Sequence, residues 1–467
     1  MTAILTNNFR LYNLKYFLNS LSTNKLYAFI GKDTSWDSEN NPPSPIDNER
    51  YTSDVYDEIL SLKKLISNNF IPVVKKHIWI SGVTYDMYRP DYNIGNGELI
   101  KYPIKLTSNS SGSLAYDSTF YVMNQFYQVY KCLYNGQTPE NPLGVSSTVE
   151  PVGVSTSPFI TNDGYRWKYL YTIPSFYVLN FINDEYIPVP YPSLGFNKES
   201  LVTSSAIKGG IDTIVILNRG SGYTSGTYTN VPIVGDGSDA TCTIVVSSGA
   251  ISSVTVTNPG QNYTFASIDI GNSGIGSGTG ANLEVIIPPV NGHGYEPMEE
   301  LYSYRLMIHF NFNYNETNFI QDISYRRIGI IVNPYVSGTS TILNSDTATG
   351  LHSITFTSTD GNYEYGEQIY QQTTGALGRV VSWDYTTNIL KYTQDRFTST
   401  TNGILKLFSG TGAVSGLSSG VSGVPNMTTY SNPDIEKNSG QILYIGNRKA
   451  IVRSSSQIED VKVVVEF

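Results

Sequence analysis

The sequence predicts a mainly β protein with a few helices near its N-terminus and two small all-β modules inserted into its core. Beyond residue 75 the chain repeats a pattern of strand, turn and strand. Tyrosine (36) outnumbers phenylalanine (18), and dense tyrosine in alternating segments suits half-buried strands whose phenol edge stays in water. Residues 201–290 and 340–430 are rich in Ser, Thr and Gly, which sets them apart from the rest of the chain.

Helical periodicity is confined to the N-terminal part of the chain. Phe9–Leu21 places apolar side chains near helical spacing. Tyr51–Ser67 repeats that pattern, with Lys63 and Lys64 near its end, where cations suit the helix dipole. Tyr27–Asp47 begins as a strand and continues as a proline-rich loop, because proline cannot donate to a strand ladder.

The first Ser/Thr/Gly-rich segment contains an internal repeat. Each copy consists of an alternating strand, a glycine turn anchored by tyrosine, and a return strand. The two copies are expected to pack together into a small β-domain that ends at Pro288 and Pro289. The first copy contains Ile211, Ile214, Ile216, Asn218, Gly220, Tyr223 and Thr224, which match Ile251, Val254, Val256, Asn258, Gly260, Tyr263 and Thr264.

The second Ser/Thr/Gly-rich segment contains Tyr363–Asp384, which indicates a small barrel or sandwich. Insertion at exposed loop tips is well tolerated, and this accounts for the abrupt shifts in composition. We therefore expect a core made of three pieces and interrupted by two modules. The expected division is 1–200 (core with helices and β-sandwich), 201–290 (β-repeat module), 291–340 (core), 341–430 (second β module) and 431–467 (C-terminal core strands).

Composition excludes several classes of protein. The formal net charge is −9, which argues against a nucleic-acid binder, since such proteins rely on Lys and Arg at phosphates. A disordered chain would carry more charge and fewer aromatic residues. The apolar runs are too short to span a membrane, and the N-terminus does not read as a secretory signal. Cys132 and Cys242 read as buried thiols of a chain made in a reducing cytoplasm.

The sequence contains no convincing catalytic string. Gly416–Gly420 reads GLSSG and fits the hydrolase elbow, but it lies in a low-complexity stretch instead of between a strand and a helix. Gly276–Ala281 has glycines like those of a dinucleotide-binding loop, but a strand follows where a helix is required. None of the four histidines has a partner at metal-ligand spacing: His77, His293, His309 and His352.

The acidic residues give no stronger signal. Glycoside hydrolysis uses two carboxylates at a fixed separation. Two clusters of acids occur, Asp360, Glu364 and Glu367 in one segment and Glu296, Glu299 and Glu300 in another. Both clusters read as solvated loop charges, and GDGSDA (235–240) lacks the acidic spacing of a calcium loop. We therefore expect no enzyme activity, no cofactor and no metal.

Five strings in the core resemble the gene product eight family of baseplate wedge subunits from T-even-like contractile-tailed bacteriophages, and they occur in the family's order. The most specific string is NDGYRWKYLYTIP…NDEYIPVPYP (162–192), which has a Gly-Tyr-x-Trp strand, then Glu-Tyr-Ile, then a proline-rich end. The other strings are FIGKDTSWDSENNPPSPID (29–47), QVYKCL (128–133), RRIGIIVNP (326–334) and SGQILYIGNRKAI (439–451). The two inserted modules depart from the family's pattern.

The resemblance implies a layered antiparallel β-sandwich core and a homodimer that contacts other baseplate wedge subunits in the virion tail, after synthesis in the host bacterial cytoplasm. It implies no catalysis, and neither nucleic acid nor a membrane is expected as a partner. The candidate interface residues come from the matching strings and from the turn around residue 293. They are Trp36, Asp37, Pro42, Pro43, Tyr165, Trp167, Tyr191, His293, Pro334, Asn447 and Arg448.

Two other functions stay open at this point. One is a tail-associated receptor-binding or adhesin protein whose tyrosine-rich insertions contact host surface glycans. The other is a polysaccharide-cleaving tail enzyme that uses acids such as Asp360 or Glu367. The lack of long parallel β-helix repeats weakens the second alternative.

Overall fold

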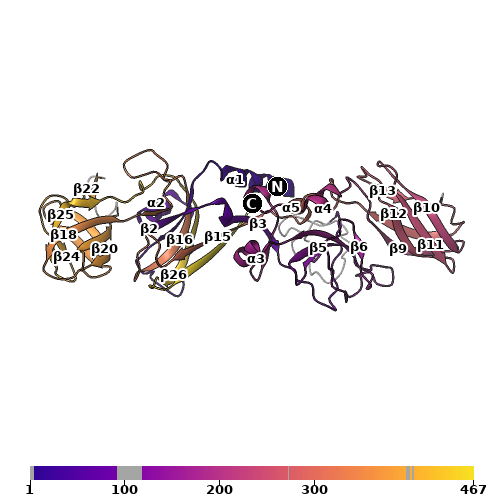
Figure 1. Cartoon of the computed structure of the whole chain (residues 1–467), viewed down its shortest axis with the longest axis horizontal. Coiled ribbons are helices and arrows are strands. Elements are labelled where there is room, and N and C mark those ends of the chain that lie inside the picture. The colour runs from indigo at the N-terminus through magenta and orange to yellow at the C-terminus, as the bar shows by residue number, and fades with distance from the viewer. Residues whose placement is uncertain (1–4, 92–117, 272, 396–399, 402–403) are drawn as a thin grey trace. The chain divides into compact units, whose positions relative to one another are not determined.

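The computed structural model describes residues 5–91, 118–271, 273–395, 400–401 and 404–467 (Figure 1). It is mainly β with several antiparallel sheets and few helices, which confirms the predicted fold class. The chain divides into two compact units. The first contains Met1–Leu18, Phe70–Ile308 and Lys462–Phe467, and the second contains Asn19–Asn69 and His309–Val461. The predicted boundaries of core pieces and inserted modules stay a prediction.

A four-stranded antiparallel sheet lies at the centre of the first unit. Its strand order is β4-β5-β7-β6. The five central residues of β5 and of β7 are all buried, so both faces of these strands are covered. The strands are β4 (Tyr121–Met123), β5 (Gln128–Tyr134), β6 (Phe159–Ile160) and β7 (Arg166–Thr172).

A second four-stranded sheet has the order β27-β15-β3-β8. Its strands are β3 (Phe70–Lys75), β8 (Tyr186–Pro188), β15 (Arg305–Asn313) and β27 (Ile458–Glu466). Helix α1 (Asn7–Ser20) confirms the first predicted helix, since it buries Leu11, Leu14 and Leu18 at helical spacing. The remaining short helices are α3 (Ser175–Phe181), α4 (Ser200–Ser204), α5 (Pro297–Glu300), η1 (Ser67–Asn69) and η2 (Pro192–Leu194).

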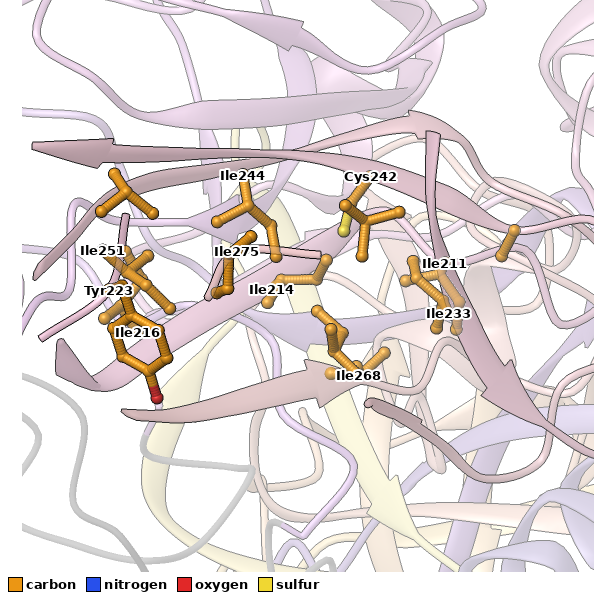
Figure 2. Packing of buried hydrophobic residues seen from close by; sticks show 14 of the residues in the cluster. Ile211, Ile214, Ile216, Tyr223, Ile233, Cys242, Ile244, Ile251, Ile268 and Ile275 are labelled. Carbon is orange, nitrogen blue, oxygen red and sulfur yellow. The ribbon is translucent and has the colours of Figure 1, made fainter. Parts of the chain in front are cut away.

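The repeat segment forms a β-domain within the first unit. Its two sheets have the orders β12-β11-β10-β13 and β14-β9. Figure 2 shows isoleucines from several of these strands gathered with Tyr223 and Cys242 in a shared apolar core. The strands are β9 (Thr213–Ser221), β10 (Gly226–Gly235), β11 (Thr241–Ser247), β12 (Ala250–Asn258), β13 (Ala266–Ile268) and β14 (Thr279–Ile286).

The two copies of the repeat make the same turn. Gly220 and Gly260 have φ of 63° and 59°, a region that glycine enters without a steric penalty. In each copy the asparagine two residues earlier accepts the N–H of this glycine, at 2.9 Å for Asn218 and 3.1 Å for Asn258. The shared sequence therefore specifies the same local geometry twice.

The tyrosines of the repeat also have matching surroundings. Tyr223 and Tyr263 are 7% and 4% exposed, and each hydroxyl accepts a backbone N–H: that of Ala281 in β14 for Tyr223, and that of Ala240, just before β11, for Tyr263. Each ring lies so close to a glycine that a β-carbon on Gly278 or Gly237 would come within 2.4 Å or 2.5 Å of it. The tyrosine and the glycine in each copy therefore depend on each other.

A five-stranded sheet in the order β17-β2-β1-β16-β26 forms the core of the second unit. Helix α2 (Glu49–Asp57) contributes Val55 and Tyr56 to the apolar cluster of this sheet. Every residue of β1 is buried. The strands are β1 (Leu26–Gly31), β2 (Ile59–Leu65), β16 (Ser324–Val332), β17 (Thr347–Thr349) and β26 (Gln441–Val452).

The second predicted helix, Tyr51–Ser67, is wrong in its C-terminal half. The helix ends at Asp57, and Ile59–Leu65 is strand β2. β2 pairs with β1 on one side and β17 on the other, and its first four residues are all buried. A continuous apolar run can be either a buried strand or a helix, and here pairing with two neighbouring strands decides the outcome.

The second Ser/Thr/Gly-rich segment is a closed barrel in the order β18-β21-β20-β19-β24-β25. Of the two predicted outcomes, barrel or sandwich, the structure shows the barrel. Its strands are β18 (His352–Thr359), β19 (Gln368–Gln371), β20 (Ala376–Asp384), β21 (Ile389–Thr393), β24 (Val414–Gly416) and β25 (Ser422–Ser431). A short pair, β22 (Thr400–Thr401) and β23 (Ile404–Leu405), follows β21.

Candidate functional site

The proline-rich loop after β1 is held against β26 in the second unit. The indole Nε1 of Trp36 donates a hydrogen bond to the carbonyl oxygen of Arg448 at 2.8 Å. The amide Nδ2 of Asn447 donates to the carbonyl oxygen of Pro43, also at 2.8 Å. Six of the predicted interface residues therefore lie on this loop or on the strand beneath it: Trp36, Asp37, Pro42, Pro43, Asn447 and Arg448.

Arg327 on β16 organises the contact between the loop and the strand. Its guanidinium forms an ion pair with Glu58, and its Nε donates to Asn447 Oδ1 at 3.0 Å. Nη2 donates to the Tyr51 hydroxyl at 3.1 Å, and the guanidinium carbon lies 5.6 Å from the centre of the Trp36 ring. Arg327 is only 2% exposed, so these partners compensate for its loss of water.

The neighbouring Arg326 holds the middle of the same loop. Its Nε lies 2.6 Å from Glu39 Oε1, and its Nη1 donates to the carbonyl of Asp33 at 2.8 Å. Desolvation would raise the pKa of Glu39, but hydrogen bonds from Arg326 and from the backbone N–H of Trp36 and Ala450 outweigh it and lower that pKa. Glu39 is therefore the acidic partner that fixes the loop.

These contacts cover part of the edge of a sheet. β26 is the last strand of its sheet, and an unpaired edge strand attracts other strands. The loop engages the backbone of this strand at the Arg448 carbonyl through Trp36, and the strand's Asn447 side chain in turn donates to the Pro43 carbonyl of the loop. The loop thus replaces a neighbouring strand here, and its own exposed residues, such as Asp37 and Pro43, face solvent.

Tyr165 and Trp167, predicted as interface candidates, are core residues of the first unit. Both are 0% exposed, and their rings stack with centroids 5.3 Å apart. The Tyr165 hydroxyl donates to the carbonyl of Val145 at 2.6 Å and accepts the N–H of Tyr85 at 3.1 Å. Because β7 is covered on both faces, neither side chain reaches the surface of this chain.

His293 lies beside a buried ion pair in the first unit. Lys131 Nζ is 3.2 Å from Glu300 Oε2, and the two side chains are 0% and 1% exposed. His293 Nδ1 is 3.4 Å from the same oxygen, and the N–H of Gly294 donates to Glu300 Oε1 at 2.5 Å. The Lys131 ammonium also lies 3.9 Å from the centre of the Tyr88 ring. This cluster joins β5 to the glycine turn and α5.

Burial and charge act in opposite directions on these groups. Desolvation would raise the pKa of Glu300, but the charge of Lys131 and the hydrogen bond with His293 outweigh it and hold the pKa below its ordinary value. Desolvation lowers the pKa of Lys131, against the effect of Glu300. Desolvation, reinforced by Lys131, also lowers the pKa of His293. His293 is therefore neutral at pH 7 and acts as a structural residue of the turn.

The two remaining candidates lie apart from these groups. Tyr191 is half-buried and forms an isolated bridge with Phe196 beside η2. Pro334 is buried just after β16, where its carbonyl accepts the N–H of Leu343 at 2.8 Å. Pro334 has no exposed surface to offer a partner.

The carboxylate nearest to the GLSSG string holds that string in place. Glu367 is 4% exposed and accepts the backbone N–H of Ser418 at 3.2 Å and of Ser419 at 3.0 Å. The Ser419 hydroxyl donates to the same carboxylate at 2.9 Å. A serine nucleophile needs a general base that orients its proton, whereas this serine caps a turn. Asp360 similarly accepts the N–H of Ser422 at 2.6 Å.

The candidate cation loop at residues 235–240 is satisfied by hydrogen bonds. Asp236 accepts the backbone N–H of Thr264 at 2.9 Å and of Phe265 at 3.1 Å, and it also accepts the Thr264 hydroxyl. The hydroxyl and backbone hydrogen bonds of Thr264 lower the pKa of Asp236 to about 2. Across the described residues, no group of three or more His, Cys, Asp or Glu side chains is arranged to hold a metal ion.

Other observations concern the membrane and the cysteines. Within the described part of the chain, no helix is long and apolar enough to cross a membrane. Cys132 and Cys242 are both buried free thiols, as predicted. Burial raises the pKa of Cys242 to about 11, so it stays protonated at neutral pH.

Sequence reasoning missed Lys131, Arg327 and Glu39, which help to hold these sites together. The reading of Glu300 and Glu367 as solvated loop charges is wrong, since they are 2% and 4% exposed and their carboxylates hold turns in place. A signal was present. Lys131 stands inside the apolar strand string QVYKCL, and two arginines open the strand string RRIGIIV. Charged residues are seldom fully buried unless they are paired, so a charge inside a core strand predicts a buried partner. The sequence does not say which partner.

Both sites described above use their charged groups to hold loops on sheets. The family model described as Bacteriophage T4, Gp8 matches residues 126–202, which include β5, β6, β7, α3 and β8. The protein named "Baseplate wedge protein gp8" of Enterobacteria phage T4 is 25% identical over 218 residues. This match covers 41% of the chain and 61% of the relative, so it spans less than two thirds of the relative's length.

These comparisons bear out the predicted resemblance over part of the chain. The matched segment contains three of the four strands of the central sheet of the first unit, β5, β6 and β7, together with α3 and β8, which follow them. The chain is therefore Gp8-like in this part, which supports a structural protein of a phage baseplate.

We expect the protein to lose stability when one partner of the buried ion pair is removed. Replacing Glu300 with glutamine (Glu300→Gln) leaves the Lys131 charge buried without its partner. We expect the free energy of unfolding at pH 7 to fall by about 3 kcal/mol, as for other buried pairs from which one partner is removed. Urea denaturation of the full chain measures the change. The matched control is Glu299→Gln, since the side chain of Glu299 is 46% exposed in its pair with Lys15; that change should cost under about 1 kcal/mol.

The same substitution tests the sign of the pH dependence. The pKa of Glu300 is lower in the folded chain than in the unfolded chain, so its stabilising effect is present above about pH 4.3 and is lost as the pH falls further. The Gln variant should therefore lose less stability than the wild type between pH 5 and pH 3. An equal acid loss in both proteins would contradict the assignment.

The loop over β26 predicts a change in protease sensitivity. Trp36→Ala removes the indole hydrogen bond to Arg448 and the contact with Lys32, whose ammonium lies 4.5 Å from the ring centre. A hydrogen bond and a cation–π contact each contribute about 1 kcal/mol, so loop opening should rise on the order of tenfold or more. Limited proteolysis followed by mass spectrometry would measure cleavage within residues 37–48. The control Asp37→Ala, at an exposed neighbour, should leave the rate unchanged; equal rates for both variants would contradict the role of Trp36.

Proposed function

We propose that this chain is a structural subunit of the baseplate wedge in the tail of a contractile-tailed bacteriophage, where it assembles as a homodimer and contacts other wedge proteins. One observation carries the proposal. It is the similarity to Gp8: the Gp8 family model matches residues 126–202, which include three of the four strands of the central sheet, and a baseplate wedge protein matches over part of the chain. The subunit acts by binding its neighbours and not by catalysis.

The buried charged groups hold loops and turns rigidly in place, as expected for a subunit of an assembly. The Lys131–Glu300 pair fixes the turn that follows the β-repeat module, and the arginines of β16 fix the loop that covers the edge of β26. A covered edge limits unwanted strand pairing, which matters for a subunit held at high local concentration in a particle. The low charged content, 15%, suits a surface that neighbours cover.

Helix α1 offers a surface for a second copy of the chain. Its exposed face carries Phe9, Tyr12 and Tyr16, and Leu5 lies just before the helix; these residues are 50%, 66%, 69% and 60% exposed. Their spacing of four, three and four residues is that of a helix seam that packs on another helix. The stripe itself is uncharged, since the two basic residues of α1 pair with glutamates elsewhere in the first unit. An identical helix can therefore pack here without charge repulsion.

Locating the chain in the particle tests the proposed function. We expect affinity-tagged chain to co-purify with isolated tails and to lie in the baseplate by electron microscopy with gold-labelled antibody. Phage lacking the gene should fail to complete baseplates. Complete tails that contain no copy of the chain would overturn the proposal, and loss of adsorption by complete particles would favour the adhesin alternative.

Light scattering after size-exclusion chromatography tests the dimer. We expect twice the mass of the chain at micromolar concentration, and a monomer for the double variant Tyr12→Glu, Tyr16→Glu, because four carboxylates would meet at the helix contact. The control Tyr385→Glu changes an equally exposed tyrosine (73%) in the barrel and should stay dimeric. A monomeric wild type would contradict the proposed dimer. A double variant that stays dimeric would show that α1 does not form the dimer interface.

A further inference from the structure

We propose that an apolar surface on the Gp8-like segment binds a neighbouring structural protein that presents apolar side chains surrounded by basic ones. This inference rests on the proposed function and gives it a specific surface. The surface consists of Phe126, Tyr127, Val152, Val154, Phe176 and Leu179. All six residues lie within the matched range 126–202.

Hydrogen bonds place the three parts of this surface side by side. The turn between β4 and β5 carries Phe126 and Tyr127. The N–H of Ile173, just before α3, donates to the carbonyl of Tyr127 at 2.9 Å. Asn124 Nδ2, at the start of the turn, donates to the carbonyl of Pro151, next to the valine loop, at 2.9 Å.

Further bonds tie down the valine loop. Gln125 donates through its backbone N–H and its side chain to Glu150, at 3.2 Å and 2.8 Å. The Tyr130 hydroxyl donates to the carbonyl of Gly153 at 2.6 Å. Because Gly153 lies between Val152 and Val154, the loop that carries both valines is fixed against the sheet. The surface is thus preformed, so little conformational entropy of these loops is lost when a partner binds.

The exposure of these side chains exceeds what the fold requires. Phe126, Tyr127 and Phe176 are 57%, 42% and 46% exposed. Val152, Val154 and Leu179 are 53%, 60% and 79% exposed. Single exposed apolar residues are ordinary, but a contiguous group of this kind marks an interaction site.

The size of the surface fits a protein partner. An aromatic side chain has roughly 200 Å² of surface, so the three aromatic residues at about half exposure supply roughly 300 Å². The three aliphatic residues bring the apolar area to the order of 500 Å². One side of a standard protein interface buries about 800 Å², of which somewhat more than half is apolar. The surface therefore matches the apolar part of one standard interface.

The charges around the surface select the partner. Asp184 and Glu185 are exposed in the turn after α3, and Glu150 is half-buried beside the valine loop. Lys76 at this turn is half-buried, and its ammonium donates to the carbonyl of Asn183 at 2.6 Å. An acidic rim attracts basic residues and disfavours a second copy of a chain whose net charge is −9. This separates the surface from the uncharged stripe on α1.

Binding measurements with the other tail proteins of the same phage test this inference. Each purified tail protein is probed by biolayer interferometry against the full-length wild-type chain and against Leu179→Asp. Buried interface anchors contribute about 2 kcal/mol or more, so the variant should weaken binding of one tail protein at least thirtyfold. The matched control is Leu201→Asp, since Leu201 is 71% exposed on α4 in the same matched segment, and it should change affinity less than threefold.

A charge-reversal variant tests the acidic rim. Asp184→Lys should weaken binding of the same partner and reduce its dependence on salt, whereas Asp47→Lys, at an exposed site in the second unit, should do neither. Circular dichroism and melting temperature should be the same for all variants, because each changes an exposed side chain.

The outcomes separate the inference from the proposed function. If a tail protein binds the wild type and Leu179→Asp equally well, the proposed binding surface is wrong, but the proposed function is not contradicted. If Leu179→Asp converts a dimer to a monomer, the surface joins two copies, which overturns the proposed partner. If no tail protein binds the wild-type chain, both the function and the inference fail.

Discussion

The structure depends most on an ion pair that water does not reach. Lys131 on β5 and Glu300 at the end of α5 are 0% and 1% exposed and lie 3.2 Å apart. Each charge alone would carry a large desolvation cost in this position, so each requires the other. The pair joins the central sheet of the Gp8-like segment to the turn at His293. It therefore fixes where the chain re-enters the core after the β-repeat module.

The second unit uses the same principle at a sheet edge. Arg326 and Arg327 are 6% and 2% exposed and find their acidic partners in Glu39 and Glu58. A proline-rich loop has few backbone donors of its own, so side chains must hold it in place. Once held, the loop satisfies the Arg448 carbonyl of β26 and covers part of an edge that would otherwise attract strands.

The buried charged residues described above form ion pairs within each unit. The two surfaces that we propose for partners consist mostly of apolar side chains. The stripe on α1 is uncharged, and the group around Phe176 and Leu179 has an acidic rim. Two surfaces of different charge suit two different partners. An uncharged surface can bind a second copy of this acidic chain, whereas a surface with an acidic rim repels that copy and favours a basic partner. This division agrees with the proposal that the chain binds both a second copy of itself and other proteins of a baseplate.

The sequence by itself determined the local features: the mainly β class, helix α1, the repeated Asn-x-Gly turns with their tyrosines, and the Gp8-like strings within residues 126–202. These follow from side-chain periodicity and backbone preference, which act over a few residues. Only the tertiary structure decided that Ile59–Leu65 is a strand, that Tyr165 and Trp167 are core, and that Lys131 meets Glu300. Each of these results depends on residues far apart in the chain, where burial and pairing outweigh local preference.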